Sequence, residues 1–238
     1  MFIRLDKYIS SQLSDLSRSK VKQLCKNGKI TVNGKVCRKS DMKIDTDQDI
    51  ISADGRIIQY KEHIYIMMNK PQGVVCSTRD GKSPTVLSLV PKELLRDGMF
   101  PAGRLDKDTE GFVLITDDGE FAHRILAPKS HVPKTYLVKL EKPLDKLSVS
   151  EFAKGITIDG GEKCMPAKLM PDKENEFLCT LEIHEGKYHQ IKRMFQSQGN
   201  KVVYLKRIAM GNLRLDKGLK LGECRELSDA EIAQLRSY

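Results

Sequence analysis

Asp106 carries a carboxyl group that could do chemistry, because it lies in a basic turn just before an apolar run. Arg104 and Lys107 flank it within the segment 102–119, AGRLDKDTEGFVLITDDG, and residues 112–115 of this segment predict a buried strand. A carboxylate held among cations stays ionised and can act as a nucleophile or a base. An ordinary surface turn also contains glycine and charged residues, so this segment alone is consistent with an active site or with a loop.

The segment GRLDKDTEG resembles the catalytic motif of the pseudouridine synthases. Four longer segments follow the order typical of that family and favour its RsuA-type branch, which modifies small-subunit ribosomal RNA: NKPQGVVCST (69–78), PTVLSLV (84–90), KTYLV (134–138) and EGKYHQIKRMF (185–195). Any one motif is weak evidence, whereas four in order indicate the family. Together with an amino-terminal segment similar to the S4 domain, the resemblance covers nearly all of the chain.

The resemblance implies that the chain isomerises a specific uridine of small-subunit (16S) ribosomal RNA to pseudouridine. This reaction detaches uracil from C1′ of the ribose, turns the ring and rejoins it through C5, so neither a cofactor nor a metal is expected. By resemblance Asp106 is the catalytic carboxylate, and whether it attacks the sugar, adds to the base or removes a sugar proton stays open. Three alternatives are a large-subunit (23S) RNA enzyme of the same family, a non-catalytic S4-domain ribosome-assembly factor, and an RNA glycosidase that releases uracil.

The cation beside Asp106 is expected to come from the segment HQIKRMF, residues 189–195. Its apolar residues recur at i, i+3 and i+4, which predicts a helix with one buried face and directs Lys192 away from that face. By resemblance Lys192 holds the catalytic carboxylate, at a position where the wider superfamily usually has arginine. Arg193 is the alternative, and it is otherwise expected to contact RNA phosphate.

Two further residues complete the predicted catalytic set. By resemblance Tyr136 packs against the target base, although a tyrosine within a strand is also typical of a core. Arg104 is expected to fill the gap left by the flipped base or to hold its phosphate, and a plain surface arginine is the alternative. Asp108 is expected to hydrogen-bond its own turn. Asp117 and Asp118 are expected to form a turn and begin a helix.

Residues 1–60 predict a small basic domain that resembles the S4 RNA-binding domain. Apolar residues at helical spacing, with Ser17 as an N-cap and Gly28 as a stop, predict two helices, and Asn33 with Gly34 predicts a hairpin. Residues 1–43 contain eleven basic and three acidic residues, a balance of 11 − 3 = +8. Six of these cations are assigned to phosphate contacts: Arg4, Arg18, Lys20, Lys22, Lys26 and Arg38.

Residues 61–238 are expected to form the catalytic domain, entered through a linker around residues 59–63. Apolar patterns in it predict strands at 64–68, 112–115 and 136–140, and helices at 120–126 and 189–198. Ser228 and Glu231 form a capping-box pattern that predicts a last helix. The resemblance adds the fold class, which is α+β: a small S4-like α/β domain followed by a catalytic domain with a central mixed, largely antiparallel sheet.

The composition agrees with a polyanionic partner. The chain has 41 basic and 32 acidic residues, a net charge of +9, and six cysteines without a C-x-x-C pair. That cysteine pattern indicates neither a zinc site nor a disulfide framework, and it favours a reducing compartment. No apolar run reaches membrane-spanning length, and the charged amino terminus is unlike a signal peptide. We therefore expect a cytoplasmic monomer that binds ribosomal RNA, without a membrane partner and without a small-molecule cofactor.

Overall fold

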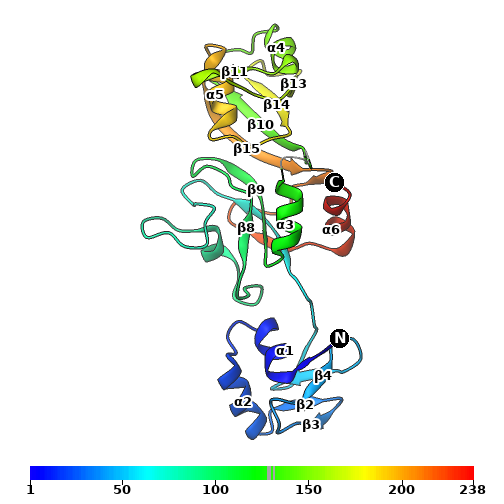
Figure 1. Cartoon of the computed structure of the whole chain (residues 1–238). Coiled ribbons are helices and arrows are strands. Elements are labelled where there is room, and N and C mark those ends of the chain that lie inside the picture. Colours follow the sequence, from blue (N-terminus) through cyan, green and yellow to red (C-terminus); the bar gives the residue numbers. More distant parts are fainter. Residues whose placement is uncertain (128–129, 131) are drawn as a thin grey trace. The chain divides into compact units, whose positions relative to one another are not determined.

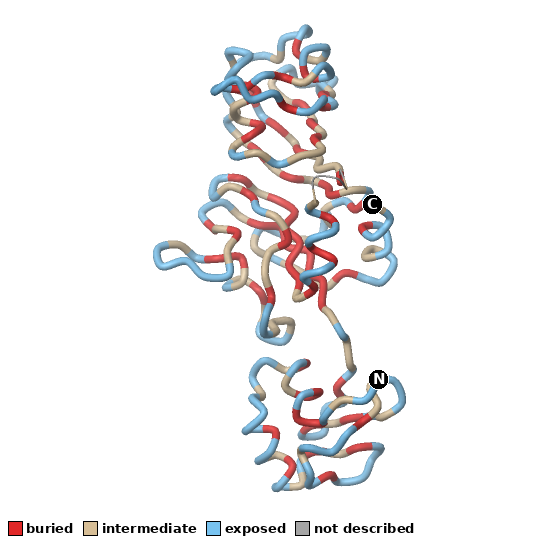
Figure 2. The backbone as a smooth tube through the Cα atoms, in the orientation of Figure 1, coloured by how far each residue is buried: buried red, intermediate tan, exposed pale blue. Residues whose placement is uncertain are grey.

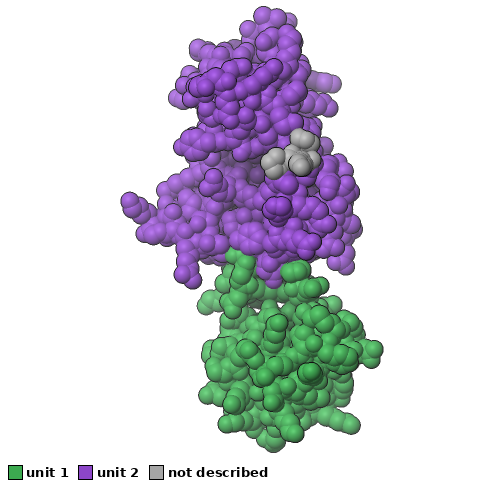
Figure 3. All heavy atoms as spheres, in the orientation of Figure 1, with its two compact units in different colours: residues 1–64, 90–99 green, residues 65–89, 100–238 purple. Residues whose placement is uncertain are grey.

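The computed structural model describes residues 1–127, 130 and 132–238, and it confirms the predicted α+β class. The chain divides into two compact units, coloured separately in Figure 3. The N-terminal unit comprises residues 1–64 and 90–99, and the C-terminal unit comprises residues 65–89 and 100–238. The sequence placed the boundary near residue 60 and contained no signal that residues 90–99 belong with the N-terminal unit.

Arg96 explains why that distant segment belongs to the N-terminal unit. Its guanidinium donates hydrogen bonds to the backbone oxygen of Lys61 at 2.9 Å and to the side-chain oxygen of Gln12 at 2.8 Å. Gln12 in turn accepts from the backbone N–H of Lys61 at 3.0 Å. A single long side chain therefore connects residues separated by more than eighty positions in the sequence.

The N-terminal unit contains two helices, a two-stranded sheet and a four-stranded antiparallel sheet in the order β3-β2-β5-β6. Its elements are β1 (Phe2–Arg4), α1 (Leu5–Gln12), α2 (Arg18–Lys26), β2 (Ile30–Val32), β3 (Lys35–Val36), β4 (Lys43–Asp45), β5 (Ile51–Ala53) and β6 (Arg56–Ile58). One apolar cluster supports all of them, and it includes Leu5 and Ile9 from α1 and Val21 from α2. Figure 2 shows buried and exposed stretches alternating along this part of the chain.

Short-range sequence signals produce the local turns of this unit. Ser17 caps α2 by accepting from the backbone N–H of Lys20 at 3.3 Å, and Gly28 follows the helix with φ of +70°. Asn33 and Gly34 have φ of +52° and +75°, the left-handed pair that a two-residue hairpin needs. The predicted cap, stop and hairpin are all confirmed.

The C-terminal unit is built on a nine-stranded sheet whose main order is β13-β14-β10-β15-β9-β7-β17, with β16 beside β15 and β8 beside β9 (Figure 1). Its strands are β7 (Tyr65–Lys70), β8 (Phe100–Ala102), β9 (Glu110–Thr116), β10 (Lys134–Leu140), β13 (Lys168–Pro171), β14 (Leu178–Ile183), β15 (Val202–Met210), β16 (Leu213–Arg214) and β17 (Cys224–Glu226). Every described pair is antiparallel except β15 with β9. The predicted mixed, largely antiparallel sheet is confirmed.

Among the described residues, four α-helices and several short elements complete this unit. They are η1 (Val86–Leu89), α3 (Gly119–Leu126), α4 (Ser148–Lys154), β11 (Thr157–Ile158), η3 (Asp159–Gly161), β12 (Glu162–Lys163), α5 (Gln190–Ser197) and α6 (Asp229–Arg236). Asp118 caps α3 by accepting from the N–H of Phe121 at 2.8 Å, and Ser228 with Glu231 forms the capping box of α6. These helix starts confirm the sequence predictions. None of the helices in the described ranges is long and apolar enough to cross a bilayer.

Gly111 makes the one parallel contact in the described sheet possible. It lies opposite Arg207 where β9 meets β15, and its φ is +103°. A Cβ at this position would lie 2.8 Å from the amide nitrogen of Arg207 and would collide with the carbonyl oxygen of the same residue. Only glycine permits this approach, which brings the turn preceding β9 close to β10 and β15.

Candidate active site

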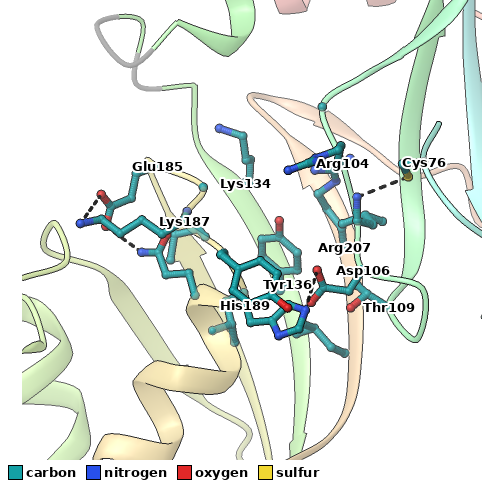
Figure 4. A pocket seen from close by; sticks show the side chains of 18 of the residues that line it. Cys76, Arg104, Asp106, Thr109, Lys134, Tyr136, Glu185, Lys187, His189 and Arg207 are labelled. Carbon is teal, nitrogen blue, oxygen red and sulfur yellow. Dashed lines mark hydrogen bonds and ion pairs between the residues drawn. The ribbon is translucent and has the colours of Figure 1, made fainter. Parts of the chain in front are cut away.

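A cavity of about 630 Å³ opens in the C-terminal unit, above the sheet face formed by β10, β14 and β15 (Figure 4). This volume is in the range of sites for small molecules. The cavity walls come from the turn before β9, from strands β10 and β15, and from the segment that leads into α5. The four residues predicted to be catalytic all line it: Arg104, Asp106, Tyr136 and Lys192.

Asp106 lies beside two basic side chains from the start of α5. Lys192 Nζ is 3.3 Å from Asp106 Oδ2, and His189 Nε2 is 3.6 Å from Asp106 Oδ1. His189 precedes the helix with a left-handed φ of +47°, a conformation that sets the direction of its side chain. The sequence pattern predicted the lysine and did not predict the histidine, because His189 lies outside the helical repeat.

Asp108 shares Lys192 with Asp106. Lys192 Nζ donates to the two carboxylate oxygens of Asp108 at 2.6 and 2.8 Å, so Asp108 has a partner beyond the turn in which the sequence placed it. Burial acts to lower the pKa of Lys192, but its bonds to the two aspartates outweigh burial, and this pKa ends above its ordinary value. Burial acts to raise the pKa of Asp108, but the bond from Lys192 outweighs it, and this pKa ends below its ordinary value. The Lys192–Asp108 pair is therefore charged at neutral pH.

A buried lysine holds the turn that carries Asp106. Lys70 is fully buried, and its Nζ donates to the backbone oxygens of Thr109 at 2.7 Å, Pro71 at 3.0 Å and Lys107 at 3.4 Å. Burial lowers the pKa of this amine and outweighs the nearby acidic groups, among them Asp106 and Asp108, which act to raise it. The NKP segment of the sequence thus positions the turn, a role that no local pattern indicated.

Tyr136 lies on the floor of the cavity. It is 7% exposed and is paired with Leu181 of β14 and Arg207 of β15. Tyr136 is therefore mostly buried, as a core residue would be, and it also lines the cavity. Arg104 is exposed on the turn before β9 and reaches the same cavity.

Arg193 is turned away from the cavity. Its guanidinium pairs with Asp159 and with Glu162, and it donates to the backbone oxygen of Tyr188 at 3.2 Å. Of the two cations that the sequence offered as partners of Asp106, Lys192 is the one that lies beside it. The expected contact of Arg193 with phosphate stays a prediction.

The N-terminal unit contains a second hollow, of about 590 Å³, with basic walls. Its cations are Arg4, Arg18, Lys22, Lys26, Arg38 and Lys39. Asp6, a buried residue of α1, accepts from Arg4 at 2.9 Å and from Arg18 at 3.0 Å and so holds both guanidinium groups at the surface. Lys20 lies outside this hollow and donates to the backbone oxygen of Asp15 at 3.0 Å. Five of the six cations assigned to phosphate contacts are therefore brought together.

Comparison with known proteins agrees with this arrangement. A family model described as RNA pseudouridylate synthase matches residues 64–197, and an S4 domain model matches residues 3–50. The chain belongs to the RNA pseudouridylate synthase family and carries an N-terminal S4 domain. The predicted family and the predicted enzyme class are both confirmed.

The individual relatives cover nearly the whole chain. An RNA pseudouridine synthase of Bacillus subtilis (strain 168), described as the uncharacterized YtzG, is 44% identical over 97% of both chains. The ribosomal small subunit pseudouridine synthase A of Vibrio cholerae is 42% identical over 98% of this chain and 99% of its own. The protein of the same name from Escherichia coli (strain K12) is 40% identical over 98% and 100%. A crystal structure of a pseudouridylate synthase superposes with a TM-score of 0.68 at 39% identity and covers 98% of this chain and 99% of its own.

Proposed function

We propose that this enzyme converts one specific uridine of small-subunit (16S) ribosomal RNA to pseudouridine, with Asp106 as the catalytic carboxylate. The observation that carries the proposal is the position of Asp106 beside Lys192, at 3.3 Å, in a cavity that Tyr136 also lines. The resemblance to the small-subunit branch of the family leads us to propose the uridine numbered 516 as the target. The family relatives named for the small ribosomal subunit support this choice of RNA.

The reaction requires a charged oxygen close to the ribose and the base. Aspartate carboxylates are ionised at neutral pH, and Lys192 with His189 fixes the direction in which this one points. The cavity removes the nucleoside from bulk water, which strengthens each polar contact inside it. Asp106 can then attack C1′, add to the base or remove a proton from the sugar, and all three routes end in the same isomer.

Tyr136 and Arg104 contribute to extraction of the target nucleotide. Stacking of a base on an aromatic side chain contributes roughly 1–3 kcal/mol, which is similar to the few kcal/mol that flipping a nucleotide costs. Tyr136 on the cavity floor supplies such a surface. Arg104, exposed at the cavity, takes the place of the flipped base or holds its phosphate.

The S4 domain holds the ribosomal RNA. Its clustered cations neutralise phosphates and orient the RNA without reading its sequence. We place the enzyme in the cytoplasm as a monomer that needs no small-molecule cofactor. Small-subunit RNA, alone or partly assembled with ribosomal proteins, is its partner.

The test incubates the protein with small-subunit RNA, free and partly assembled, and maps pseudouridine by chemical labelling. Wild type is expected to modify one uridine, and Asp106→Asn is expected to lose at least about 10³-fold in rate while its RNA affinity is unchanged. Asp229→Asn, an exposed aspartate on α6, is the matched control and should retain full activity. Modification by Asp106→Asn at the wild-type rate would exclude Asp106 as the catalytic group.

The same assay separates the alternatives. A large-subunit enzyme would modify 23S RNA and leave small-subunit RNA unchanged. An RNA glycosidase would release free uracil, which chromatography detects. An assembly factor without catalytic activity would produce no pseudouridine in either RNA, and cells carrying Asp106→Asn would grow as wild type does.

A further inference from the structure

Arg207 is a buried cation whose hydrogen-bonding capacity is mostly unused. It is 1% exposed, and its Nε donates to the backbone oxygen of Phe112 at 2.7 Å. Within the described residues its Nη2 has no hydrogen-bond partner, and no carboxylate pairs with its guanidinium. A buried charge without a counterion is costly, and such a group beside a cavity indicates a ligand that accepts its hydrogen bonds.

The sheet register places Arg207 next to the stacking tyrosine. Tyr136 of β10 and Arg207 of β15 are directly paired, so their side chains project from the same face of the sheet. Lys134 lies two residues before Tyr136 on β10, and it also lines the cavity. Tyr136 therefore has Lys134 beside it on the same strand and Arg207 beside it on the neighbouring strand. Figure 4 shows all three side chains at the cavity.

The acids of the cavity do not neutralise these two cations. Asp106 is engaged with Lys192 and His189. Glu185 accepts from Gln190 at 2.7 Å and from the backbone N–H of Met165 at 2.8 Å. Burial, together with the nearby charge of Arg207, lowers the pKa of Lys134 to about 8. Such a pKa is expected where two cations lie close together without a carboxylate between them.

We propose that Lys134 and Arg207 form a cationic subsite that binds the carbonyl oxygens of the uracil ring and retains the ring while it is detached from the ribose. This inference rests on the proposed function and deepens it. Breaking the N1–C1′ bond leaves its electron pair on the ring, where O2 and O4 share the negative charge. The ring then turns, C5 bonds to C1′ and loses its proton, and N1 takes up a proton, so the product has the same atoms as the substrate.

The subsite fits uracil better than the other candidate ligands. Directly opposed side chains on paired strands lie about 5 Å apart, and alternate residues of one strand about 6.6 Å apart. A base stacked on Tyr136 therefore has its edges within reach of both cations. Cytosine carries an amino group at position 4, which cannot accept a hydrogen bond from a lysine or an arginine. A backbone phosphate is a less suitable ligand, because Arg207 is only 1% exposed and lies beside Tyr136, where only a group as deep in the cavity as the stacked base can reach it.

The test compares two free bases of nearly equal shape. Uracil is neutral near pH 7.5, whereas 6-azauracil loses its ring proton close to neutral pH. Calorimetry or ligand-observed NMR on the full chain is expected to show that wild type binds 6-azauracil about 10-fold or more tighter than uracil, because hydrogen bonds to a charged partner are the stronger ones. Equal affinity of wild type for the two bases would overturn the proposal.

Substitutions then assign the preference to the two cations. Lys134→Met and Arg207→Gln should each reduce the preference for 6-azauracil over uracil to about 3-fold or less, and Arg207→Lys should keep most of this preference. Lys139→Met, an exposed lysine further along β10, is the matched control and should behave as wild type. If Arg207→Gln does not fold, Lys134→Met alone decides, since it leaves the bond to Phe112 in place. An unchanged preference in Lys134→Met would overturn the proposal.

A second comparison excludes a phosphate subsite. Uridine and uridine 5′-monophosphate are titrated against the same variants, and the gain from the phosphate is expected to be equal in wild type and in Lys134→Met. A loss confined to the monophosphate would show that the cations hold phosphate and would overturn the assignment to the ring. Because none of these measurements uses RNA, their outcome is independent of whether wild type forms pseudouridine in the RNA assay.

Discussion

The two hollows of this protein both contain several cations, but they use them in different ways. In the N-terminal hollow the side chains of Arg4 and Arg18 are 49% and 55% exposed and share one buried acid, Asp6. In the cavity of the C-terminal unit Lys192 is 26% exposed and Arg207 only 1%. Binding at the N-terminal hollow is expected to depend on the number of its cations. The chemistry in the cavity is expected to depend on the position of each cation.

The physical reason is solvent screening. Exposed charges are surrounded by water and salt, so each phosphate contact contributes modestly and a neighbour can replace it. A partly buried cation beside a carboxylate is neither screened nor replaceable, and its removal leaves the carboxylate uncompensated. Substitutions in the two regions should therefore differ in size and in their dependence on salt.

The largest effect is expected at the junction of β9 and β15. Gly111→Ala should lower the free energy of unfolding by more than about 4 kcal/mol, because a Cβ would collide with the backbone of Arg207 and φ is +103°. Gly81→Ala, where a Cβ meets no atom within 4 Å, is the control. Chemical denaturation measures both variants, and similar stability of the two would show that the strands can separate without cost.

Loss of the cation beside Asp106 should follow in size. Lys192→Met is expected to cost about 3–5 kcal/mol in the modification step, a rate loss on the order of 10²- to 10⁴-fold, because Asp106 and Asp108 lose their shared partner. Single-turnover kinetics on small-subunit RNA measures it. Lys192→Arg should recover part of the rate, since arginine keeps the charge but changes the geometry.

Asp108 provides the matched comparison for that variant. Its side chain is 69% exposed, so Asp108→Asn should raise the activation free energy of the modification step by about 1 kcal/mol or less. A loss from Asp108→Asn as large as that from Lys192→Met would mean that Asp108, and not Asp106, is the partner that matters.

The basic hollow of the S4 domain should respond differently. Arg18→Ala with Lys22→Ala should weaken RNA binding and should reduce the slope of log affinity against log salt by about 1 for each lost phosphate contact. The rate at saturating RNA should be unchanged. Lys20 lies outside the hollow, so Lys20→Ala should weaken RNA binding less than the double substitution does. Filter binding at several salt concentrations measures both, and an equal loss of affinity in Lys20→Ala would contradict the role of the hollow.

The smallest expected effect is a pH dependence of the N-terminal unit. Bonds from Arg4, opposed by burial and supported by Arg18, keep the pKa of Asp6 below the ordinary value of 3.8. The contribution of Asp6 to stability is therefore complete above about pH 3.8 and is lost as the pH falls through the lower folded-state pKa. Acid titrations of wild type and Asp6→Asn should converge at low pH. Curves that stay parallel throughout would contradict this assignment.

Much of the local structure follows from the sequence by itself. Ser17, the pair Asn33 and Gly34, Asp118 and the Ser228 capping box all act within a few residues, so their effects are visible in the sequence. The ordered motifs likewise indicated the family and a catalytic set whose members do line one cavity.

Only the tertiary structure decided which distant groups meet. Lys70 holds the turn of Asp106 through backbone oxygens, and a backbone acceptor leaves no trace in residue types. The choice of Lys192 over Arg193 depends on the rotation of α5, and the pairing of Arg207 with Tyr136 depends on strand register. The two adjacent cations of β15, Lys206 and Arg207, were a usable signal for a functional group on this strand. The position of Arg207 beside Tyr136 required the fold, because register is set by contacts between residues far apart in the chain.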